Sequence, residues 1–513
     1  MRLRCFEKFE IEDCALPRDL TGDNFKTLGH ERSGTSPLVP SDAQRKTIYA
    51  LSTPPGKAGV AVIRISGPDV LDVWNRMVKV THAKQSRNFN PNPWRMYRCN
   101  VLHPDNKQVL DDGLAVYFKA PRSFTSEDVM ELHIHSGQAV IAAVLNALSL
   151  LSQCRLAEPG EFTRRAFAAG SLDLTQVEGL KDLINSETES QRVVALSAMS
   201  GNLRNWLEQL RKDIISCLSL VEALIDFSEE DVEEGVHDEA RTRARRIVAS
   251  IETQLSNFHR GEILRSGVKL AIFGPPNAGK SSLFNVLAQR EAAIVTSIPG
   301  TTRDVLELSL DIGGLPVIVA DTAGLRHTED VVEKIGIERA TEKITNADVA
   351  LCILPIPDVY DGRDISMPPE LSSMISRNDT YFLFNKSDLL QSSSIENLEI
   401  SVPSLNASGV WIVSLTTGAG ISKFLKEFGH ALQQRYGLLK EQQGGSEPLI
   451  THARHRVHLE NARRFLEAFI DEDDVVLAAE ELRYAAQDIG KITGRIDVED
   501  VLDVIFRDFC IGK

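Results

Sequence analysis

The first regular pattern of apolar and polar residues runs from 47 to 66 and predicts two strands. The segment TIYALSTPPGKAGVAVIRIS places a Pro-Pro-Gly turn between two stretches rich in Val and Ile, which is typical of strand, turn and strand. Strand-like runs follow at 113–118 and 129–135, and a helix-like stretch covers 138–152. We therefore predict a small mixed α/β unit that ends near Gly170.

A helical periodicity replaces this pattern from about residue 172 to 265. Apolar residues recur there at steps of three and four, with almost no Pro or Gly, as in the helices of a bundle. A second helical stretch covers 449–509, after the polar linker KEQQGGSEP. The two stretches indicate one helical domain that is interrupted by an inserted domain, which is tolerated because the ends of a domain usually lie close together.

Between the two helical stretches, strands and helices alternate. The strand VKLAIFG (268–274) opens this region, and further candidate strands lie at 316–321, 348–354, 380–385 and 410–415. Such alternation predicts a parallel sheet that is covered on both faces. The predicted fold class is therefore multidomain α/β and all-α: an N-terminal α/β domain, then a helical bundle interrupted by an inserted P-loop domain.

Length and composition agree with several domains. With 513 residues, 42% of them hydrophobic, the chain is large enough for two to four cores. The predicted parts are a leader at 1–44, an N-terminal domain at 45–170, a first helical part at 171–266, a nucleotide-binding domain at 267–436 and a second helical part at 437–513.

Charge and cysteine content limit the possible functions. The net charge of −15 argues against coating of nucleic acid by bulk electrostatics, so any RNA contact must be local or shared with a partner. Seven scattered cysteines without metal-site spacing predict reduced thiols. No apolar run long enough for a membrane-spanning helix occurs. Residues 1–44 hold more acidic than basic residues, which is unusual for a mitochondrial transit segment.

The segment GPPNAGKS, residues 274–281, matches the P-loop pattern between a strand and a helix. Its glycines allow backbone N–H groups to turn toward phosphate oxygens, Lys280 supplies charge, and Ser281 offers a hydroxyl to Mg²⁺. In PGTTRD (299–304), Thr302 is the second candidate Mg²⁺ ligand. In DTAG (321–324), Asp321 ends a strand beneath the metal.

The segment NKSD, residues 385–388, predicts guanine as the base. The carboxylate of Asp388 can accept hydrogen bonds from the N1 and N2 donors of guanine, a pair that adenine lacks. Ser414, at the end of the next predicted strand, is expected beside the guanine oxygen. The nucleotide is therefore GTP. However, Leu325 follows DTAG where many GTPases carry a glutamine, so either the chain binds GTP and barely cleaves it, or the polar contact that orients the attacking water comes from elsewhere.

With these motifs in place, the sequence resembles the tRNA modification GTPases of the MnmE/TrmE family, most nearly the mitochondrial form of eukaryotes. The resemblance runs from about residue 47 to 513. It rests on TPPGKAGVAVIRISG, SFTSEDVMELHIHSG, PGEFTRRAF, GPPNAGKSS, PGTTRDV, DTAGLR, NKSD and the terminal CIGK. The predicted GTP-binding residues are Asn277, Ala278, Gly279, Lys280, Ser281, Ser282, Thr296, Ser297, Ile298, Pro299, Gly300, Thr301, Thr302, Asp321, Thr322, Ala323, Gly324, Asn385, Lys386, Asp388 and Ser414.

The resemblance implies that K⁺ replaces an arginine finger when the GTPase domains of a dimer meet. The family's K⁺ ligands fall on the Asn277 side chain, the carbonyls of Thr296 and Ile298, and Thr301. From the residues alone, Asn277 could instead brace the P-loop. The family's catalytic acid, which positions the attacking water, falls on Glu333, although a lone Glu at a helix start is usually a cap or a solvated residue.

The resemblance also implies a reduced folate, 5,10-methylene- or 5-formyl-tetrahydrofolate, bound between the N-terminal domains of a homodimer. The matching positions are Arg64, Glu131 and Lys513. Cys510 in CIGK is a possible functional thiol, or simply a small buried apolar residue. Many family members carry a lysine where this chain has Ser171, which removes one charge from the expected folate contacts.

The function implied is a K⁺-activated GTPase that installs a taurinomethyl or carboxymethylaminomethyl group on C5 of tRNA wobble uridine 34 in mitochondria. The implied partner is an MnmG/MTO1-type protein that carries FAD, since this chain lacks a GxGxxG dinucleotide loop after a strand. Two alternatives remain at this point: a regulatory or ribosome-assembly GTPase without tRNA chemistry, and a folate-dependent aminomethyl transferase that acts without GTP.

Overall fold

A computed structural model provides the structure of the chain. The residues that it describes are 46–81, 90–226, 235–290, 308–319, 347–360, 365, 380–390, 407–436, 450–496, 502, 505–507, 509, 511 and 512.

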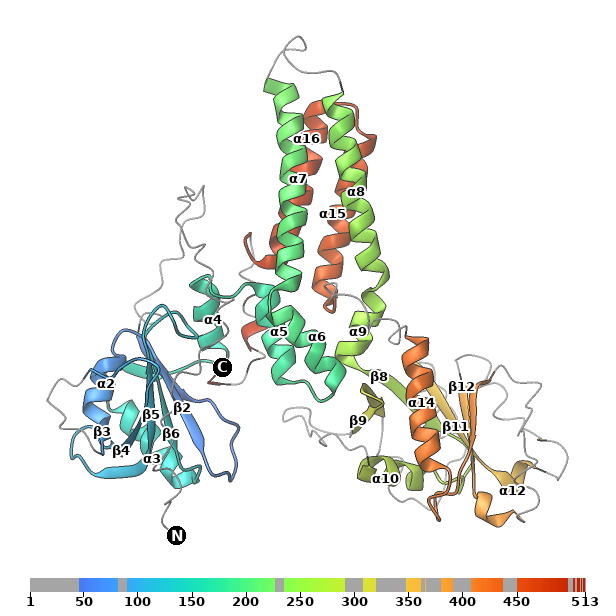
Figure 1. Ribbon diagram of the computed structural model, residues 1–513, viewed down its shortest axis with the longest axis horizontal. Helices are drawn as coiled ribbons and strands as arrows, with labels where there is room; N and C mark the ends of the chain where they lie inside the picture. Colours follow the sequence, from blue (N-terminus) through green and yellow to red (C-terminus); the bar gives the residue numbers. More distant parts are fainter. Residues whose placement is uncertain are drawn as a thin grey trace, which may run out of the picture. The chain divides into compact units, whose positions relative to one another are not determined.

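The N-terminal part is a seven-stranded sheet in the order β3-β4-β5-β6-β2-β1-β7 (Figure 1). Its strands are β1 (Thr47–Leu51), β2 (Ala61–Ser66), β3 (Val78–Val80), β4 (Met96–Leu102), β5 (Val109–Phe118), β6 (Val129–Ile134) and β7 (Cys154–Leu156). Neighbouring strands are antiparallel except β1 and β7. The predicted strands at 113–118 and 129–135 are the end of β5 and all of β6.

One face of this sheet is covered by helices. Ile63 and Ile65 of β2 and Leu132 of β6 pack in one core with residues of α2 (Val70–Met77) and α3 (Gln138–Ser149). Because side chains alternate along a strand, the intervening residues point to the opposite face. The helix predicted at 138–152 ends three residues early, and α4 (Glu161–Ala168) follows β7.

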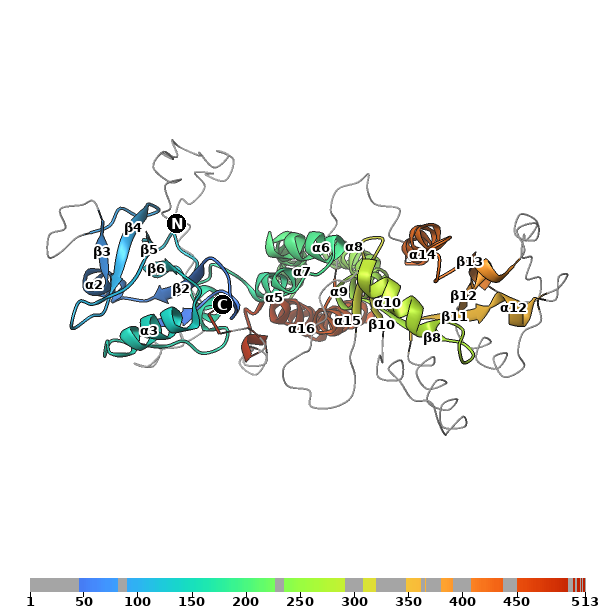
Figure 2. The same ribbon diagram turned by 90° about the horizontal axis from the view of Figure 1, so that it is seen from below.

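Helices from both sides of the inserted domain share one core. Leu207 and Ile214 precede the insertion, Leu466 and Leu482 follow it, and all four belong to the same buried cluster. The long helices α7, α8, α15 and α16 are grouped together in both views (Figures 1 and 2). The helices are α5 (Leu174–Ile184), α6 (Glu189–Met199), α7 (Asn202–Asp226), α8 (Val236–Ser256), α9 (Phe258–Ser266), α15 (Ala453–Asp471) and α16 (Val475–Thr493). This sharing confirms the predicted interrupted bundle.

The inserted part is a six-stranded sheet in the order β13-β12-β11-β8-β10-β9. Its elements are β8 (Val268–Phe273), α10 (Lys280–Arg290), β9 (Leu308–Ile312), β10 (Leu315–Val319), β11 (Val349–Pro355), α12 (Ile356–Val359), β12 (Thr380–Asn385), the 3₁₀ helix η3 (Ser387–Leu389), β13 (Ala407–Ile412) and α14 (Ile421–Arg435). Strands β11 and β12 are buried throughout, as expected of parallel strands covered on both faces.

Two details differ from the prediction for this sheet. Strand β9 is antiparallel to β10, because the Gly313–Gly314 turn joins them as a hairpin. The strand predicted at 410–415 lies at Ala407–Ile412, so Ser414 follows the strand and does not end it. In the described residues, no helix is long and apolar enough to cross a membrane.

Candidate functional site

The P-loop connects β8 to α10, and its glycines are required by close packing. A Cβ at Gly274 would lie 2.1 Å from the carbonyl oxygen of Ile353, and one at Gly279 would lie 2.3 Å from Nδ2 of Asn385. Gly279 also has a φ of +105°, a left-handed backbone that side chains rarely adopt. The loop therefore packs tightly on the strand ends and turns into the N-terminus of α10, where backbone N–H groups favour anions.

Lys280 is the first residue of α10, and its ammonium group is held over the loop. Its Nζ donates to the carbonyl oxygens of Gly274 and Pro275, both at 2.8 Å. Burial disfavours the charged ammonium and so lowers the pKa of Lys280. An anionic phosphate beside the ammonium would favour the charged form and offset this effect. Ser281 and Ser282 follow in the first turn of the same helix.

Asn385 joins the guanine-binding segment to the P-loop. Its Nδ2 donates to the carbonyl oxygen of Ala278 at 2.8 Å, and its Oδ1 accepts from the backbone N–H of Leu415 at 3.1 Å. Asn385 is buried at the end of β12. Asn385 therefore fixes the P-loop, the guanine-binding segment and the loop after β13 relative to one another.

Asp388 is exposed in η3, and a buried serine orients it. Ser414 Oγ donates to Asp388 Oδ1 at 2.6 Å, and Ser414 is fully buried. The preceding Lys386 has a left-handed backbone with a φ of +65°, which turns the chain sharply after β12. The structure thus brings Lys280, Asn385, Asp388 and Ser414 together around one loop system. Within the described residues, the contact from Ser414 uses Oδ1 of Asp388 and no hydrogen bond engages Oδ2, so that oxygen can accept from the guanine donors.

Asn277 is the one predicted K⁺ ligand that the structure describes. Its backbone is left-handed, with a φ of +59°. The side chain is exposed, and within the described residues it makes no hydrogen bond that would brace the P-loop. The role of Asn277 as a K⁺ ligand therefore stays a prediction.

The other predicted residues of the nucleotide site lie outside the described residues. They are Thr296, Ser297, Ile298, Pro299, Gly300, Thr301, Thr302, Asp321, Thr322, Ala323, Gly324 and Glu333. Cys510 and Lys513 lie outside them as well.

Arg64 and Glu131 form an ion pair across β2 and β6. Arg64 Nε donates to Glu131 Oε1 at 2.9 Å, and the two residues are partners in the strand register. Burial alone would raise the pKa of Glu131, but the adjacent His133 and Arg64 hold it below its usual value. The pair is thus charged in a half-buried position.

This ion pair lies on the sheet face opposite to helices α2 and α3. The Arg64 guanidinium lies 5.3 Å from the ring centre of Phe124 and 5.8 Å from that of Phe162. On the same face Leu114 is 38% exposed, and it pairs with His133 in the register. Two charges framed by aromatic and apolar side chains fit a ligand with a flat polar ring and a carboxylate.

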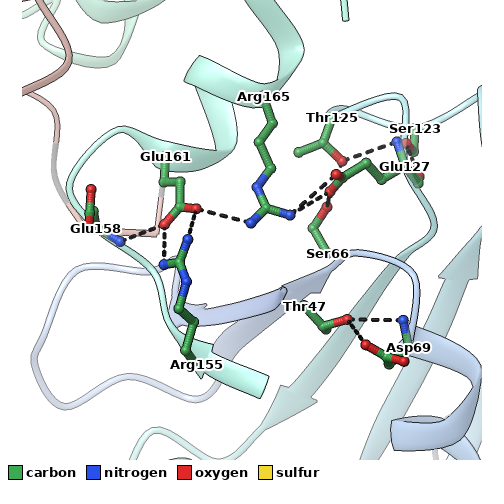
Figure 3. A network of polar contacts seen from close by, with 10 residues as sticks. All are labelled: Thr47, Ser66, Asp69, Ser123, Thr125, Glu127, Arg155, Glu158, Glu161 and Arg165. Atoms are coloured by element: carbon green, nitrogen blue, oxygen red, sulfur yellow. Dashed lines mark hydrogen bonds and ion pairs between the residues drawn. The ribbon is translucent and has the colours of Figure 1, made fainter. Parts of the chain in front are cut away.

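A polar network that the motifs alone did not reveal anchors α4 beside this face (Figure 3). Arg165 donates to Glu127 at 3.0 Å and to Glu161 at 3.0 Å. Arg155 binds the same Glu161 through both terminal nitrogens, at 2.8 and 2.5 Å. The network holds α4, and with it Phe162, against the strand that carries Arg64. Its only signal in the sequence was the presence of Glu127, Glu161 and Arg165 in the quoted motifs SFTSEDV and PGEFTRRAF, and Arg155 lies in neither.

Ser171, at the position where many family members carry lysine, forms a hydrogen bond with Ser126 between side-chain oxygens. Ser126 itself has a left-handed backbone. A neutral contact therefore stands where a positive charge was expected.

Two family models match the chain. The model described as the GTP-binding protein TrmE N-terminus matches residues 47–171, and the MnmE helical domain model matches residues 174–510.

The chain is also similar to whole proteins. It is 42% identical over 482 residues to the 5-taurinomethyluridine-[tRNA] synthase subunit GTPB3, mitochondrial, of Danio rerio, with 91% of this chain and 93% of that protein covered. It is 45% identical over 474 residues to the tRNA modification GTPase MnmE of Parvibaculum lavamentivorans, with 91% and 100% covered. A solved G domain of the FeoB iron transporter of T. maritima covers 32% of this chain at 21% identity, with a TM-score of 0.22, a likeness too low to carry a conclusion.

Proposed function

Because the chain belongs to the MnmE/TrmE family of tRNA modification GTPases, we propose that it hydrolyses GTP in the modification of tRNA wobble uridine 34. With a reduced folate as the carbon donor and an FAD-dependent MnmG/MTO1-type partner, it installs a C5-methylene-linked substituent. The zebrafish relative is named for taurinomethyluridine, which supports a taurinomethyl product over carboxymethylaminomethyl.

The observation that carries the nucleotide half of this proposal is the contact between Asn385 and Ala278. It joins the phosphate-binding loop to the segment whose Asp388 selects guanine. Lys280 and the N-terminus of α10 bind and orient the phosphates, and Ser414 holds the carboxylate of Asp388 in place for the base.

The metal ions follow from the motifs. Ser281 and Thr302 would hold Mg²⁺, while Asn277, Thr296, Ile298 and Thr301 would hold K⁺. Positive charge there stabilises the negative charge that develops on the β- and γ-phosphate oxygens in the transition state. Glu333 orients the attacking water, which the apolar side chain of Leu325 cannot do.

The carbon-donor half rests on the ion pair of Arg64 and Glu131. The guanidinium can bind the glutamate carboxylate of a folate, and a carboxylate can accept from the N–H groups of a pterin ring. Lys513 completes this set, and Cys510 is a possible functional thiol near it. Ser171 leaves one charged contact out, so folate binds through fewer ionic contacts than in relatives with lysine.

A homodimer would cover the open sheet face beside this ion pair. Trp94 is 62% exposed and Met96 is 52% exposed. The ring of Trp94 contacts that of Phe118 of β5 in a T-shaped arrangement. Burying such apolar side chains against a second copy is favourable. We place the protein in mitochondria, because a relative that it resembles over 91% of its length is named as mitochondrial.

The test of the nucleotide mechanism is GTP hydrolysis in K⁺ compared with Na⁺, for the wild type and for Glu333→Ala. We expect the rate in Na⁺ to fall on the order of a hundredfold, and Glu333→Ala to lose on the order of a hundredfold in K⁺. Binding of a non-hydrolysable GTP analogue should be unchanged in that variant. Equal rates in both salts, or an unaffected variant, would refute the mechanism.

The regulatory or ribosome-assembly alternative predicts K⁺ stimulation without folate binding. Calorimetric titration with 5-formyl-tetrahydrofolate separates the two. Arg64→Ala should abolish the heat of binding, whereas Arg192→Ala, which removes an exposed arginine paired with Glu189 on α6, should leave it unchanged. The aminomethyl transferase alternative requires one-carbon transfer without GTP.

A further inference from the structure

A chain with a net charge of −15 must contact tRNA through a local surface. In the helical bundle, a crevice of about 450 Å³ lies between α7 and α8. Trp206, Leu210 and Asp213 line it from α7, and Arg243, Arg246 and Ile247 line it from α8. We call it the α7–α8 crevice.

The floor of the crevice is rigid. Leu210 and Ile247 are buried and belong to the core of the bundle, and Trp206 packs against the same core while part of its surface stays accessible. The spacing of 206, 210 and 213 along one helix, and of 243, 246 and 247 along the other, places each set on one face. An aromatic ring is therefore fixed at the wall of an open crevice.

The rim holds Arg243, Arg246 and Asp213, and these three charged residues differ in how far neighbouring side chains satisfy them. Arg243 is tethered by a hydrogen bond from Nη1 to Ser216 Oγ at 3.0 Å and by an ion pair with Glu239. The acidic residue Asp213 accepts from Gln209 Nε2 at 2.9 Å. Arg246 is exposed and forms no ion pair or hydrogen bond within the described part of the chain.

We propose that the α7–α8 crevice is a tRNA-binding site, in which Arg246 binds a backbone phosphate and Trp206 stacks on an unpaired base. Indole rings stack on bases regardless of sequence, and a guanidinium binds phosphate with two parallel hydrogen bonds. This proposal rests on the proposed function, because it needs tRNA as the substrate. A docking surface for a protein partner is the competing possibility.

The test is equilibrium binding of an unmodified tRNA transcript to the full-length protein, measured by fluorescence anisotropy at several salt concentrations. Arg246→Glu should weaken binding roughly tenfold or more and reduce the salt slope by about one. The matched control is Arg464→Glu on α15, which reverses an exposed arginine outside the crevice and should retain wild-type affinity. GTP hydrolysis without tRNA should be the same in all of these proteins.

Trp206 provides a second line of test. Trp206→Ala should weaken tRNA binding. Trp206→Phe should keep most of the wild-type affinity, because a phenyl ring can still stack on a base. Wild-type affinity in Arg246→Glu and Trp206→Ala would overturn the crevice proposal and leave the proposed function standing. Absence of tRNA binding by the wild type would overturn both.

Discussion

Glu178 of α5 and His455 of α15 approach each other to 2.6 Å, between Oε2 and Nε2, although 277 residues separate them. Both side chains are buried. Arg454 binds the same carboxylate through Nε and Nη2, each at 3.1 Å, and it also donates to the carbonyl oxygen of Ile492 at the end of α16. This cluster therefore joins the two parts of the helical domain that the inserted domain separates in the sequence.

The cluster predicts that acid destabilises the fold. Burial alone would raise the pKa of Glu178, but the facing His455 and Arg454 hold it well below 4.5. Burial lowers the pKa of His455 below 6.5. Both folded pKa values lie below the unfolded ones, so acidification adds protons to the unfolded chain first. The contribution of His455 is thus present above about pH 6.5 and falls below it, and that of Glu178 falls only below about pH 4.5, each by up to about 1.4 kcal/mol per pH unit.

Urea unfolding between pH 5 and pH 7.5 checks this prediction. His455→Gln keeps a donor toward Glu178 but cannot titrate, so the free energy of unfolding should depend less on pH than in the wild type. His259→Gln replaces an imidazole that is 73% exposed, and it should keep the wild-type slope because water solvates the ring in both states. Identical slopes for the wild type and His455→Gln would contradict the account.

Asp388→Asn should exchange the base specificity. An amide offers one donor and one acceptor, which suits the C2 carbonyl of xanthine and not the N2 amino group of guanine. We expect GTP affinity to fall roughly a hundredfold and xanthosine triphosphate affinity to rise. Competition binding with the two nucleotides measures this exchange. Asp358→Asn, an exposed substitution in α12, is the control, and unchanged preference in Asp388→Asn would exclude the assigned guanine contact.

Gly279→Ala should disrupt the P-loop. The added Cβ would meet Asn385 Nδ2 at 2.3 Å, and a left-handed backbone costs a side chain about 1–2 kcal/mol. The loop must move away from Asn385, so GTP affinity should fall roughly tenfold or more. Gly59→Ala is the matched control, since nothing lies within 4 Å of the Cβ it would add. Normal GTP binding by Gly279→Ala would show that the close approach is not required.

Arg165→Ala should destabilise the N-terminal domain. It removes one of the two arginine partners of Glu161, whose side chain is 8% exposed, and the arginine partner of Glu127, and loss of such charged hydrogen bonds costs about 2 kcal/mol. Thermal unfolding should show the loss, together with weaker folate binding because α4 carries Phe162 beside Arg64. Arg192→Ala breaks an exposed pair with Glu189 and should change little. Equal unfolding temperatures for the two variants would argue against the network.

The sequence predicted most accurately the elements with the strongest patterns. The apolar run TYFLFN is β12 at the predicted limits, because a strand buried on both faces needs apolar residues throughout. The short strands β3 and β7, each of three residues, were not predicted. Their residues lack a distinctive pattern, and their partners β4 and β1 fix their conformation.

The site was predictable where one motif holds the chemistry and not where distant segments meet. Lys280 and Asp388 each followed from a short motif. In contrast, the pairing of Arg165 with Glu127 and that of His455 with Glu178 depend on packing between remote elements. No local periodicity encodes such contacts, so only the fold reveals them.

The most direct test of the central claim, GTP-driven modification of wobble uridine 34, is mass spectrometry of nucleosides from mitochondrial tRNAs of cells that lack the gene. We predict that the C5-methylene-linked substituent is lost, that the wild-type protein restores it, and that Lys280→Ala, which removes the ammonium group from the P-loop, does not. Wobble nucleosides that are unchanged by loss of the gene, or fully restored by Lys280→Ala, would contradict the claim.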